Sequence, residues 1–402
     1  MLTTRPPWRL GRAELATDEA VNEPKAMAAA PPIMIASEIF RTSRHAPGHP
    51  LAIPRVSLTI DLCRALGWLR PGCYVEASPA NTAELLRFHT ADYVTAVQRA
   101  EARQHATEED RQRFNLGVNG NPVYGEVFRR PAMACGASLD AARRLRHSGI
   151  VYNPAGGTHH GQPARASGYC IFNDPALAIL ALLDQGLPRV AYVDFDAHFG
   201  DGVQQAFHDE ARVLTISVHE DGRWPMRRND AATGFGGRDD RAGGVARNLP
   251  VPEGFNDSEL AFLVENAIVP LVRKFNPSGI VVQCGADALA DDPTTKLALS
   301  NGALWAAVAA LKPLSARLLV LGGGGYNPWA VARCWTGLWG MLNGIGSPAR
   351  LPGPAADLLR AVRWTHRLGR TPAERWFTTL ADPPHQGPIR RAVRSLVDRV
   401  LG

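Results

Sequence analysis

Short apolar runs that alternate with longer helical patterns constrain the fold of this chain most strongly. Segments with helical length and spacing lie at 175–185, 257–275 and 302–311. Strands that are apolar on both faces and separated by helices are typical of a parallel sheet with helices on both sides. We therefore expect an α/β fold with a central, mostly parallel sheet. We predict strands at 33–39, 73–76, 150–153, 189–196, 213–218, 279–283 and 317–321.

The sheet is expected to belong to one domain, 32–402, which closes on an amphipathic helix with apolar positions from Ile389 to Val400. Residues 1–31 contain acidic side chains and no continuous apolar stretch, so we interpret them as a flexible extension and not as a secretory signal. Met27 is an alternative start of translation. The charged, glycine-rich stretch 221–244 is predicted to be a long surface loop.

Composition excludes several classes of protein. The chain is 45% hydrophobic and 20% charged, and no apolar run is long enough to cross a bilayer, so no membrane partner is expected. The net charge is +6, but arginines are scattered and form no block, so no nucleic-acid partner is expected. The six cysteines are widely spaced, which indicates reduced core thiols and a cytoplasmic location.

Polar residues gather where predicted strands end. His159 and His160 follow the strand at 150–153, and His198 ends the strand at 189–196. Asp287 and Tyr326 follow the last two predicted strands. Ligands bind at the carboxyl edge of open α/β sheets, so we expect these distant segments to converge on one pocket.

One of these segments predicts a metal site. Asp194, Asp196, His198 and Asp201 lie within ten residues, 193–202, at the end of an apolar strand. Buried carboxylates are costly unless they are paired or bind a cation. The two-residue steps would place the first three on one face if the strand stayed regular. Aspartate and histidine together suit Zn²⁺ or a similar divalent ion.

Each residue also has a purely structural alternative. His159 and His160 could cap a helix or form a hydrogen-bonded core pair, and Asp287 could be a helix N-cap. Tyr326 could be a core tyrosine. The glycines Gly156 and Gly157 favour function for the histidine pair, since glycine allows the backbone to approach a ligand closely.

The glycine run 322–325 invites a dinucleotide-loop interpretation, which we reject. The dinucleotide pattern requires a further glycine where Asn327 stands, and Pro328 is expected to prevent a helix from following at once. The run is better explained as backbone that passes tightly beside a pocket and delivers the Tyr326 hydroxyl into it.

Five motifs together resemble the zinc-dependent histone deacetylase family, most closely the bacterial acetoin utilization deacetylases. The resemblance covers roughly residues 32–345 and implies a single arginase-like α/β domain that removes acetyl groups from amines. The motifs are GGTHH at 156–160, GYCIFND at 168–174, DFDAHFGDG at 194–202, CGAD at 284–287 and GGGGY at 322–326.

The resemblance also implies roles for individual residues. One Zn²⁺ would be held by Asp196, His198 and Asp287. His160 would be the general base and acid, His159 its electrostatic partner, and Tyr326 the oxyanion donor. Asp194 would orient His159, and Asp201 would orient His160. A separate base is reasonable because two carboxylates cancel the charge of Zn²⁺ and leave its water less acidic than in a three-histidine site.

Substrate contacts are implied at Gly168, Tyr169, Trp224 and Gly324, with Tyr169 walling an acyl-lysine tunnel. Phe172 could share that wall or belong to the core. A monovalent cation, K⁺, would bind near Asp194, Asp196 and His198 and at the hydroxyl of Ser217.

Two positions depart from the family pattern. Gly120 stands where many members carry an aspartate that grips the substrate backbone, and Phe199 replaces a usual second histidine. We expect Phe199 to affect packing more than metal binding. The predicted function is zinc-dependent hydrolysis of acetyl-lysine amides in proteins or peptides. A small acylated amine such as an acetylpolyamine is the alternative substrate, and a non-catalytic binder of acyl-lysine is a weaker alternative.

Overall fold

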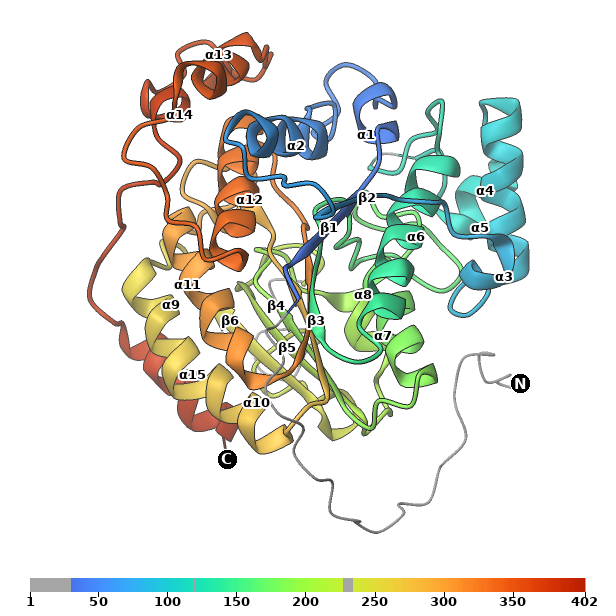
Figure 1. Cartoon of the computed structure of the whole chain (residues 1–402). Helices are drawn as coiled ribbons and strands as arrows, with labels where there is room; N and C mark the ends of the chain where they lie inside the picture. The colour runs from blue at the N-terminus through green and yellow to red at the C-terminus, as the bar shows by residue number, and fades with distance from the viewer. Residues whose placement is uncertain (1–29, 119, 227–233, 402) are drawn as a thin grey trace.

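A single parallel sheet organises the chain. The computed structural model describes residues 30–118, 120–226 and 234–401. Its eight strands follow the order β2-β1-β3-β8-β7-β4-β5-β6, and all neighbours are parallel, which confirms the predicted fold class. Figure 1 shows the strands at the centre of the chain, with helices around them. The strands are β1 Ile33–Ala36, β2 Tyr74–Glu76, β3 Gly149–Asn153, β4 Val190–Asp194, β5 Val213–Glu220, β6 Ala246–Val251, β7 Gly279–Gln283 and β8 Arg317–Leu321.

Every predicted strand is present, with small differences at the ends. The first strand stops at Ala36, earlier than predicted, and the fourth stops at Asp194. β6 was not predicted, because it carries Arg247, Asn248 and Pro250 and lacks a continuous apolar run. Such a sequence is compatible with a strand at the edge of a sheet, where one side needs no hydrogen-bonding partner.

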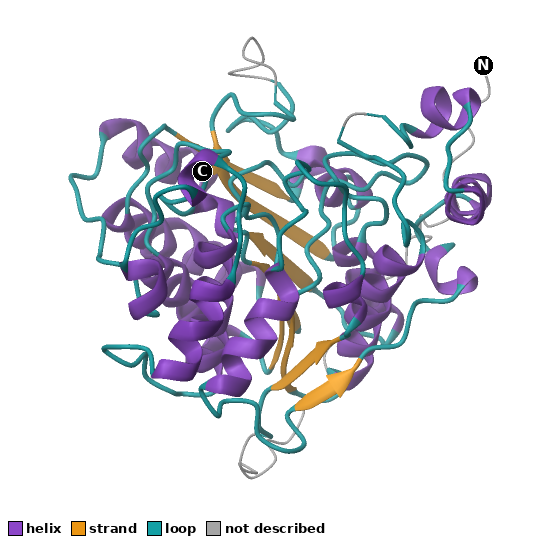
Figure 2. Cartoon of the chain, turned by 90° about the horizontal axis from the view of Figure 1, so that it is seen from above, coloured by secondary structure: helices purple, strands orange, loops and turns teal. Residues whose placement is uncertain are grey.

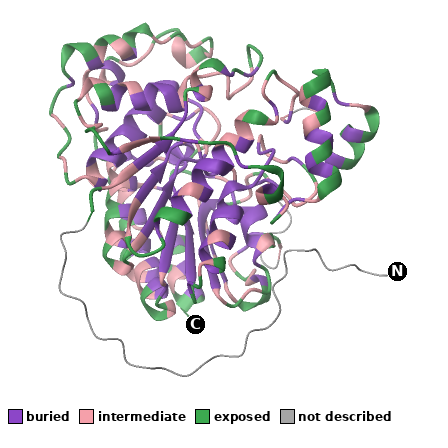
Figure 3. Ribbon diagram, turned by 45° about the vertical axis from the view of Figure 1, so that its right-hand side comes forward, coloured by how far each residue is buried: buried purple, intermediate pink, exposed green. Residues whose placement is uncertain are grey.

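Helices cover both faces of the sheet, as Figure 2 shows, and the central strands are buried along their length (Figure 3). One hydrophobic core contains residues of α2, α9, α10, α11, α12 and α15, and a second, on the other face, contains residues of α4, α6 and α7. The helices are α1 Ile39–Thr42, α2 Arg55–Ala65, α3 Thr82–Leu85, α4 Ala91–Arg103, α5 Glu108–Phe114, α6 Arg129–Arg144, α7 Asp174–Asp184, α8 Asp201–Ala206, α9 Asp257–Leu263, α10 Val269–Phe275, α11 Asn301–Leu311, α12 Pro328–Leu342, α13 Gly353–Ala361, α14 Arg375–Thr378 and α15 Arg391–Leu401.

Two helix predictions need correction. The helix predicted over 257–275 is α9 and α10 joined by a π-helical turn, Val264–Ile268. The expectation that Pro328 delays the next helix is wrong, since α12 begins at that proline. Proline suits the first turn of a helix, where its missing N–H has no partner to lose. The side chain of Asn327 caps the same helix through the N–H groups of Trp329 and Ala330.

The ends of the chain are only partly tested. α15 packs against β6 and α9, as expected for the closing amphipathic helix. The predicted extension 1–31, with Met27, lies outside the described residues except for its last two positions, so the boundary at residue 32 stays a prediction. In the predicted loop 221–244, residues 227–233 lie outside the described chain. The described parts hold no strand and a single 3-10 turn, Ala242–Gly244. None of the described helices is long and apolar enough to span a membrane.

The close packing of α6 gives a stability prediction. A Cβ at Gly136 would lie 1.9 Å from the carbonyl oxygen of Ser78, whereas a Cβ at Gly302 in α11 meets only Ser300 Oγ at 3.7 Å. We expect Gly136→Ala to lower the free energy of unfolding by about 3 kcal/mol through overpacking. The matched Gly302→Ala should raise it by about 0.5 kcal/mol, because alanine favours helix. Urea unfolding of both variants measures the difference, and equal stabilities would contradict the close contact of α6.

Candidate metal centre and active site

The polar residues at the strand ends converge as predicted. They follow β3, β8, β7 and β4, which are consecutive neighbours in the sheet. Parallel neighbours end at the same edge, so side chains far apart in the sequence meet there. His159, His160, His198 and Tyr326 all line one inner cavity of about 50 Å³.

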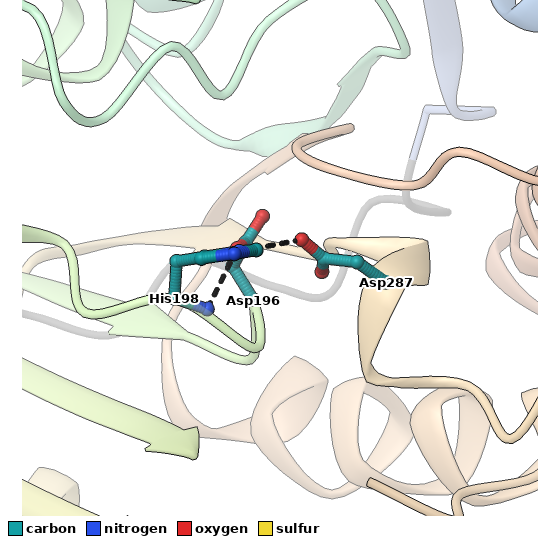
Figure 4. A group of neighbouring side chains, drawn as sticks. All are labelled: Asp196, His198 and Asp287. Carbon is teal, nitrogen blue, oxygen red and sulfur yellow. Dashed lines mark hydrogen bonds and ion pairs between the residues drawn. The ribbon is translucent and has the colours of Figure 1, made fainter. Parts of the chain in front are cut away.

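Three of the converging side chains form a candidate metal centre. The ligand atoms of Asp196, His198 and Asp287 all lie within 4.8 Å of one another. Nδ1 of His198 lies 2.9 Å from Oδ2 of Asp287 and 3.3 Å from Oδ1 of Asp196 (Figure 4). Both carboxylates are buried, with exposures of 1% for Asp196 and 0% for Asp287.

The electrostatics of this group call for a positive charge. Burial disfavours a charged imidazole, yet the adjacent carboxylates of Asp196 and Asp287 raise the pKa of His198 to about 10. Burial and the Asp196 carboxylate raise the pKa of Asp287 to about 7. Two carboxylates and one imidazole around a common point are a donor set that Zn²⁺ accepts, so the residues fit the predicted ion.

The backbone reaches this arrangement by leaving the strand. β4 ends at Asp194, so the regular strand on which a shared face for Asp194, Asp196 and His198 depended does not extend that far. Instead, the Asp194 carboxylate accepts the N–H of Asp196 at 3.0 Å, and the Asp196 carboxylate accepts the N–H of His198 at 3.0 Å. These side-chain-to-backbone turns rotate the chain after the strand. Asp194 consequently faces His159, while Asp196 and His198 face Asp287.

Glycines allow the metal centre to be this compact. A Cβ at Gly285 would lie 2.2 Å from Oδ2 of Asp196, and a Cβ at Gly324 would lie 2.1 Å from Oδ2 of Asp287. The N–H of Gly324 also donates to Asp196 at 2.6 Å. Gly324 lines the inner cavity, and its predicted contact with substrate stays a prediction.

The capping alternative for Asp287 is wrong. Asp287 lies within the 3-10 turn Ala286–Ala288, not at its cap, and its Oδ1 accepts the N–H of Ala197. That bond ties the segment after β7 to the segment after β4. The geometry therefore supports the ligand interpretation of Asp287.

His159 and His160 form a buried pair in which each ring has its own carboxylate. Nδ1 of His159 lies 2.7 Å from Asp194, and Nδ1 of His160 lies 2.5 Å from Asp201, which matches the predicted pairings. The two Nε2 atoms are 2.9 Å apart. Neither residue caps a helix, so that alternative is wrong. The core-pair alternative is incomplete, because His160 also lines the outer cavity.

The two histidines differ in protonation. Burial lowers the pKa of His159 less than the carboxylates of Asp194 and Asp196 raise it, and its pKa is about 9. Burial and the neighbouring charge of His159 lower the pKa of His160 to about 4, although Asp201 opposes this shift. Of the two rings, His159 therefore keeps its proton to higher pH, and His160 is the better proton acceptor.

The buried carboxylate of Asp174, which the sequence analysis missed, supports the loop that carries His159 and His160. The Asp174 carboxylate accepts the N–H groups of Gly157 and Thr158 at 3.0 and 2.8 Å, and the hydroxyl of Ser138 at 2.5 Å. A Cβ at Gly157 would lie 2.7 Å from the backbone nitrogen of Gly323. The predicted close backbone approach at these glycines is therefore to the protein itself. Asp174 ends the motif GYCIFND, but only the tertiary contacts reveal its role.

An outer cavity of about 380 Å³ leads to the site. Its lining includes Gly168, Tyr169, Trp224, His160 and Tyr326. Trp224 is 49% exposed, and the centroid of its ring lies 4.7 Å from that of His160. A Cβ at Gly168 would lie 2.5 Å from the His160 ring, so only glycine allows this approach. Tyr326 lines both cavities, which argues against a purely core role.

Three further positions that the sequence analysis singled out are Phe172, Phe199 and Gly120. Phe172 is fully buried among Tyr93 and Phe128, which places it in the core. Phe199 packs against His219 and not in the metal centre. Gly120 has φ +88° and lines the outer cavity, where a Cβ would lie 3.5 Å from the Tyr169 ring.

Arg55 is a second residue that sequence reasoning missed. Its guanidinium donates to the carbonyl oxygen of Gly323 at 2.7 Å and lies over the ring of Trp335. The residue lines the inner cavity beside the glycine run. Burial lowers the pKa of Arg55, and the nearby acidic groups oppose that shift. No pattern in the sequence distinguished this arginine from the many others.

Comparisons with known proteins agree with this geometry. The family described as histone deacetylase domain matches residues 49–342. Histone deacetylase 9 of Arabidopsis thaliana is 37% identical over 309 residues, 76% of this chain and 72% of that protein. Putative histone deacetylase 2 of Caenorhabditis elegans is 36% identical over 313 residues, 76% of this chain but only 60% of that protein.

Solved structures agree as well. The crystal structure of a histone deacetylase homologue from Aquifex aeolicus superposes with a TM-score of 0.87 at 32% identity. The superposition covers 93% of this chain and 100% of the homologue's chain. A histone deacetylase homologue complexed with SAHA matches with the same values. The chain belongs to the histone deacetylase family and is a hydrolase with deacetylase activity.

Proposed function

We propose that this chain is a zinc-dependent deacetylase that hydrolyses the amide of acetyl-lysine in proteins or peptides and releases acetate. The arrangement of Asp196, His198 and Asp287 within 4.8 Å of one another, beside a histidine pair of unequal pKa, carries this proposal. The particular closeness to acetoin utilization deacetylases stays a prediction.

Asp196, His198 and Asp287 would hold the Zn²⁺. Bound there, the ion supplies Lewis-acid chemistry, which polarises an amide carbonyl and makes water more acidic. A K⁺ ion near Asp194, Asp196, His198 and Ser217 remains part of the proposal. The pairing of Ser217 with Asp194 in the register of β5 and β4 supports it.

His160 is the proposed general base and acid. Its low pKa leaves Nε2 unprotonated, and the contact of Nδ1 with Asp201 orients the ring. Once Nε2 exchanges its contact with Nε2 of His159 for one with water, it can take a proton from the water that attacks the amide and return it to the leaving amine. His159, kept cationic by Asp194, stabilises negative charge that develops beside it.

Tyr326 is the proposed oxyanion donor. Its hydroxyl is kept protonated, because burial and the carboxylates of Asp287 and Asp196 hold its pKa well above the usual value. A hydroxyl that stays protonated can donate to the oxygen on which charge develops.

The outer cavity favours a neutral acylated side chain over a polyamine. Among the described residues that line it, none is acidic, and Tyr169 and Trp224 present rings. A polyamine carries further ammonium groups, which are costly to desolvate without a carboxylate. A small acylated amine remains the alternative substrate, because Gly120 offers no side chain that could bind a peptide backbone.

The first experiment compares two substrates. Acetate release by the zinc-loaded protein is measured from an acetyl-lysine peptide and from acetylputrescine, with and without a hydroxamate chelator. We expect release from the peptide that the chelator abolishes. Release only from acetylputrescine would move the function to small amines, and tight binding of the peptide without release from either would favour a binding protein.

Replacing Tyr326 tests the oxyanion role. Tyr326→Phe removes one hydrogen-bond donor and should lower kcat by about 100-fold or more, with zinc content unchanged. Metal analysis and steady-state kinetics on the same preparation measure both quantities. Unchanged turnover would contradict the role.

Replacing Asp287 tests the ligand set. Asp287→Asn should lower zinc content strongly, because a neutral amide is a poor replacement for a carboxylate ligand. The matched control is Asp201→Asn, which changes a buried carboxylate next to His160 and should retain zinc while losing activity. Full zinc content in the Asp287 variant would remove this residue from the ligand set.

A further inference from the structure

The segment after Asp287 contains a buried carboxylate that the proposed mechanism does not use. Asp292 is only 6% exposed. Its Oδ2 accepts the backbone N–H of Tyr326 at 2.7 Å. Its Oδ1 accepts the N–H of Thr294 at 2.9 Å and the hydroxyl of Thr294 at 2.6 Å. Three hydrogen bonds to one buried carboxylate hold it firmly, and bonds to an ionised acceptor are about twice as strong as neutral ones.

The backbone before Tyr326 has little stiffness of its own. Four consecutive glycines precede the tyrosine, and φ is +130° at Gly323 and +126° at Gly325. Glycine has the largest backbone freedom of any residue, so such a segment keeps one conformation only if contacts impose it. The hydrogen bond from the backbone N–H of Tyr326 to Asp292 is such a contact. It acts on the residue whose hydroxyl must lie in the cavity.

A second hydrogen bond holds the same segment one residue after Tyr326. The side-chain amide of Asn327 donates to the carbonyl oxygen of Asp291 at 3.0 Å. The Asp291 carboxylate in turn accepts hydrogen bonds from Arg375 at 2.5 Å and from the indole of Trp376 at 2.6 Å. Arg375 and Trp376 belong to α14, outside the residues 49–342 that the family matches. The C-terminal part of this chain therefore braces the segment that holds the tyrosine.

The same segment is also tied to the rim of the outer cavity. Arg223, next to Trp224, donates to the carbonyl oxygen of Thr294, and its guanidinium pairs with Glu220. Thr294 in turn donates to Asp292. Residues 291–294 thus connect Trp224 at the rim of the outer cavity, Tyr326 and α14.

We propose that Asp292 is a positioning residue that fixes the Tyr326 hydroxyl in the cavity by holding the tyrosine backbone. This inference rests on the proposed function, in which that hydroxyl stabilises the oxyanion. A misplacement of about 1 Å in a catalytic group can cost about 100-fold in rate, so one backbone hydrogen bond at this position has a large effect on turnover.

Asp292→Asn is the test variant. The amide keeps the shape of the carboxylate but offers a single acceptor oxygen, so it cannot serve both Tyr326 and Thr294. We expect kcat to fall about 10- to 100-fold, with KM changed less than about twofold and zinc content unchanged.

The matched control is Asp257→Asn at the start of α9. The Asp257 carboxylate likewise accepts one hydroxyl and two backbone N–H groups, from Ser300 and His385, and it lines neither catalytic cavity. This variant should keep the parent kcat. A comparable fall in kcat for both variants would show general loss of structure and overturn the proposal.

A double-mutant cycle separates positioning from general damage. In the Tyr326→Phe background the hydroxyl is absent, so Asp292→Asn should lower kcat less than about twofold further. A full additional loss would overturn the proposal, because Asp292 would then act independently of the hydroxyl.

The cycle also distinguishes this inference from the proposed function. If Tyr326→Phe alone keeps full turnover, the oxyanion role fails and the positioning role fails with it. If Tyr326→Phe loses turnover while Asp292→Asn keeps the parent kcat, only the positioning role is overturned.

Discussion

The close approach of the Asp196 and Asp287 carboxylates is the constraint on which the rest of the site depends. Both are buried, and each would be costly in isolation. At Gly285 and Gly324 the carboxylates occupy the space that a side chain would need, so only glycine fits at these two positions. His198 lies against both, and their negative charges raise its pKa to about 10. A bound cation would satisfy several of these neighbouring groups at once.

The histidine pair shows how neighbouring groups of one type acquire different properties. His159 and His160 are adjacent, and each faces an aspartate, yet their pKa values are about 9 and about 4. Burial acts on both rings, but Asp196 lies near only the first, and the charge of His159 suppresses protonation of the second. The two adjacent rings therefore hold their protons over different ranges of pH.

Local patterns in the sequence determined the fold class and much of the candidate site. The apolar runs predicted the parallel strands, because a strand covered by helices on both faces must be apolar throughout. Only β6, an edge strand with polar residues and a proline, escaped this signal. The resemblance of the motifs to the histone deacetylase family implied that Asp196, His198 and Asp287 share a metal site, and the structure brings their ligand atoms within 4.8 Å of one another.

Only the tertiary structure decided which groups support and position these residues. Arg55 and Asp292 contact backbone segments that are distant in sequence, and no local pattern marks them. Asp174 stands in the motif GYCIFND, but its contacts with the loop at Gly157 follow only from the tertiary structure. The end of β4 at Asp194 turns neighbouring carboxylates in different directions, which alternation alone could not show. The sequence shows which residue types stand at the strand ends, and their chemistry indicates a site there. The orientation of these side chains, and the groups that support them, depend on how loops from separate parts of the chain pack against one another.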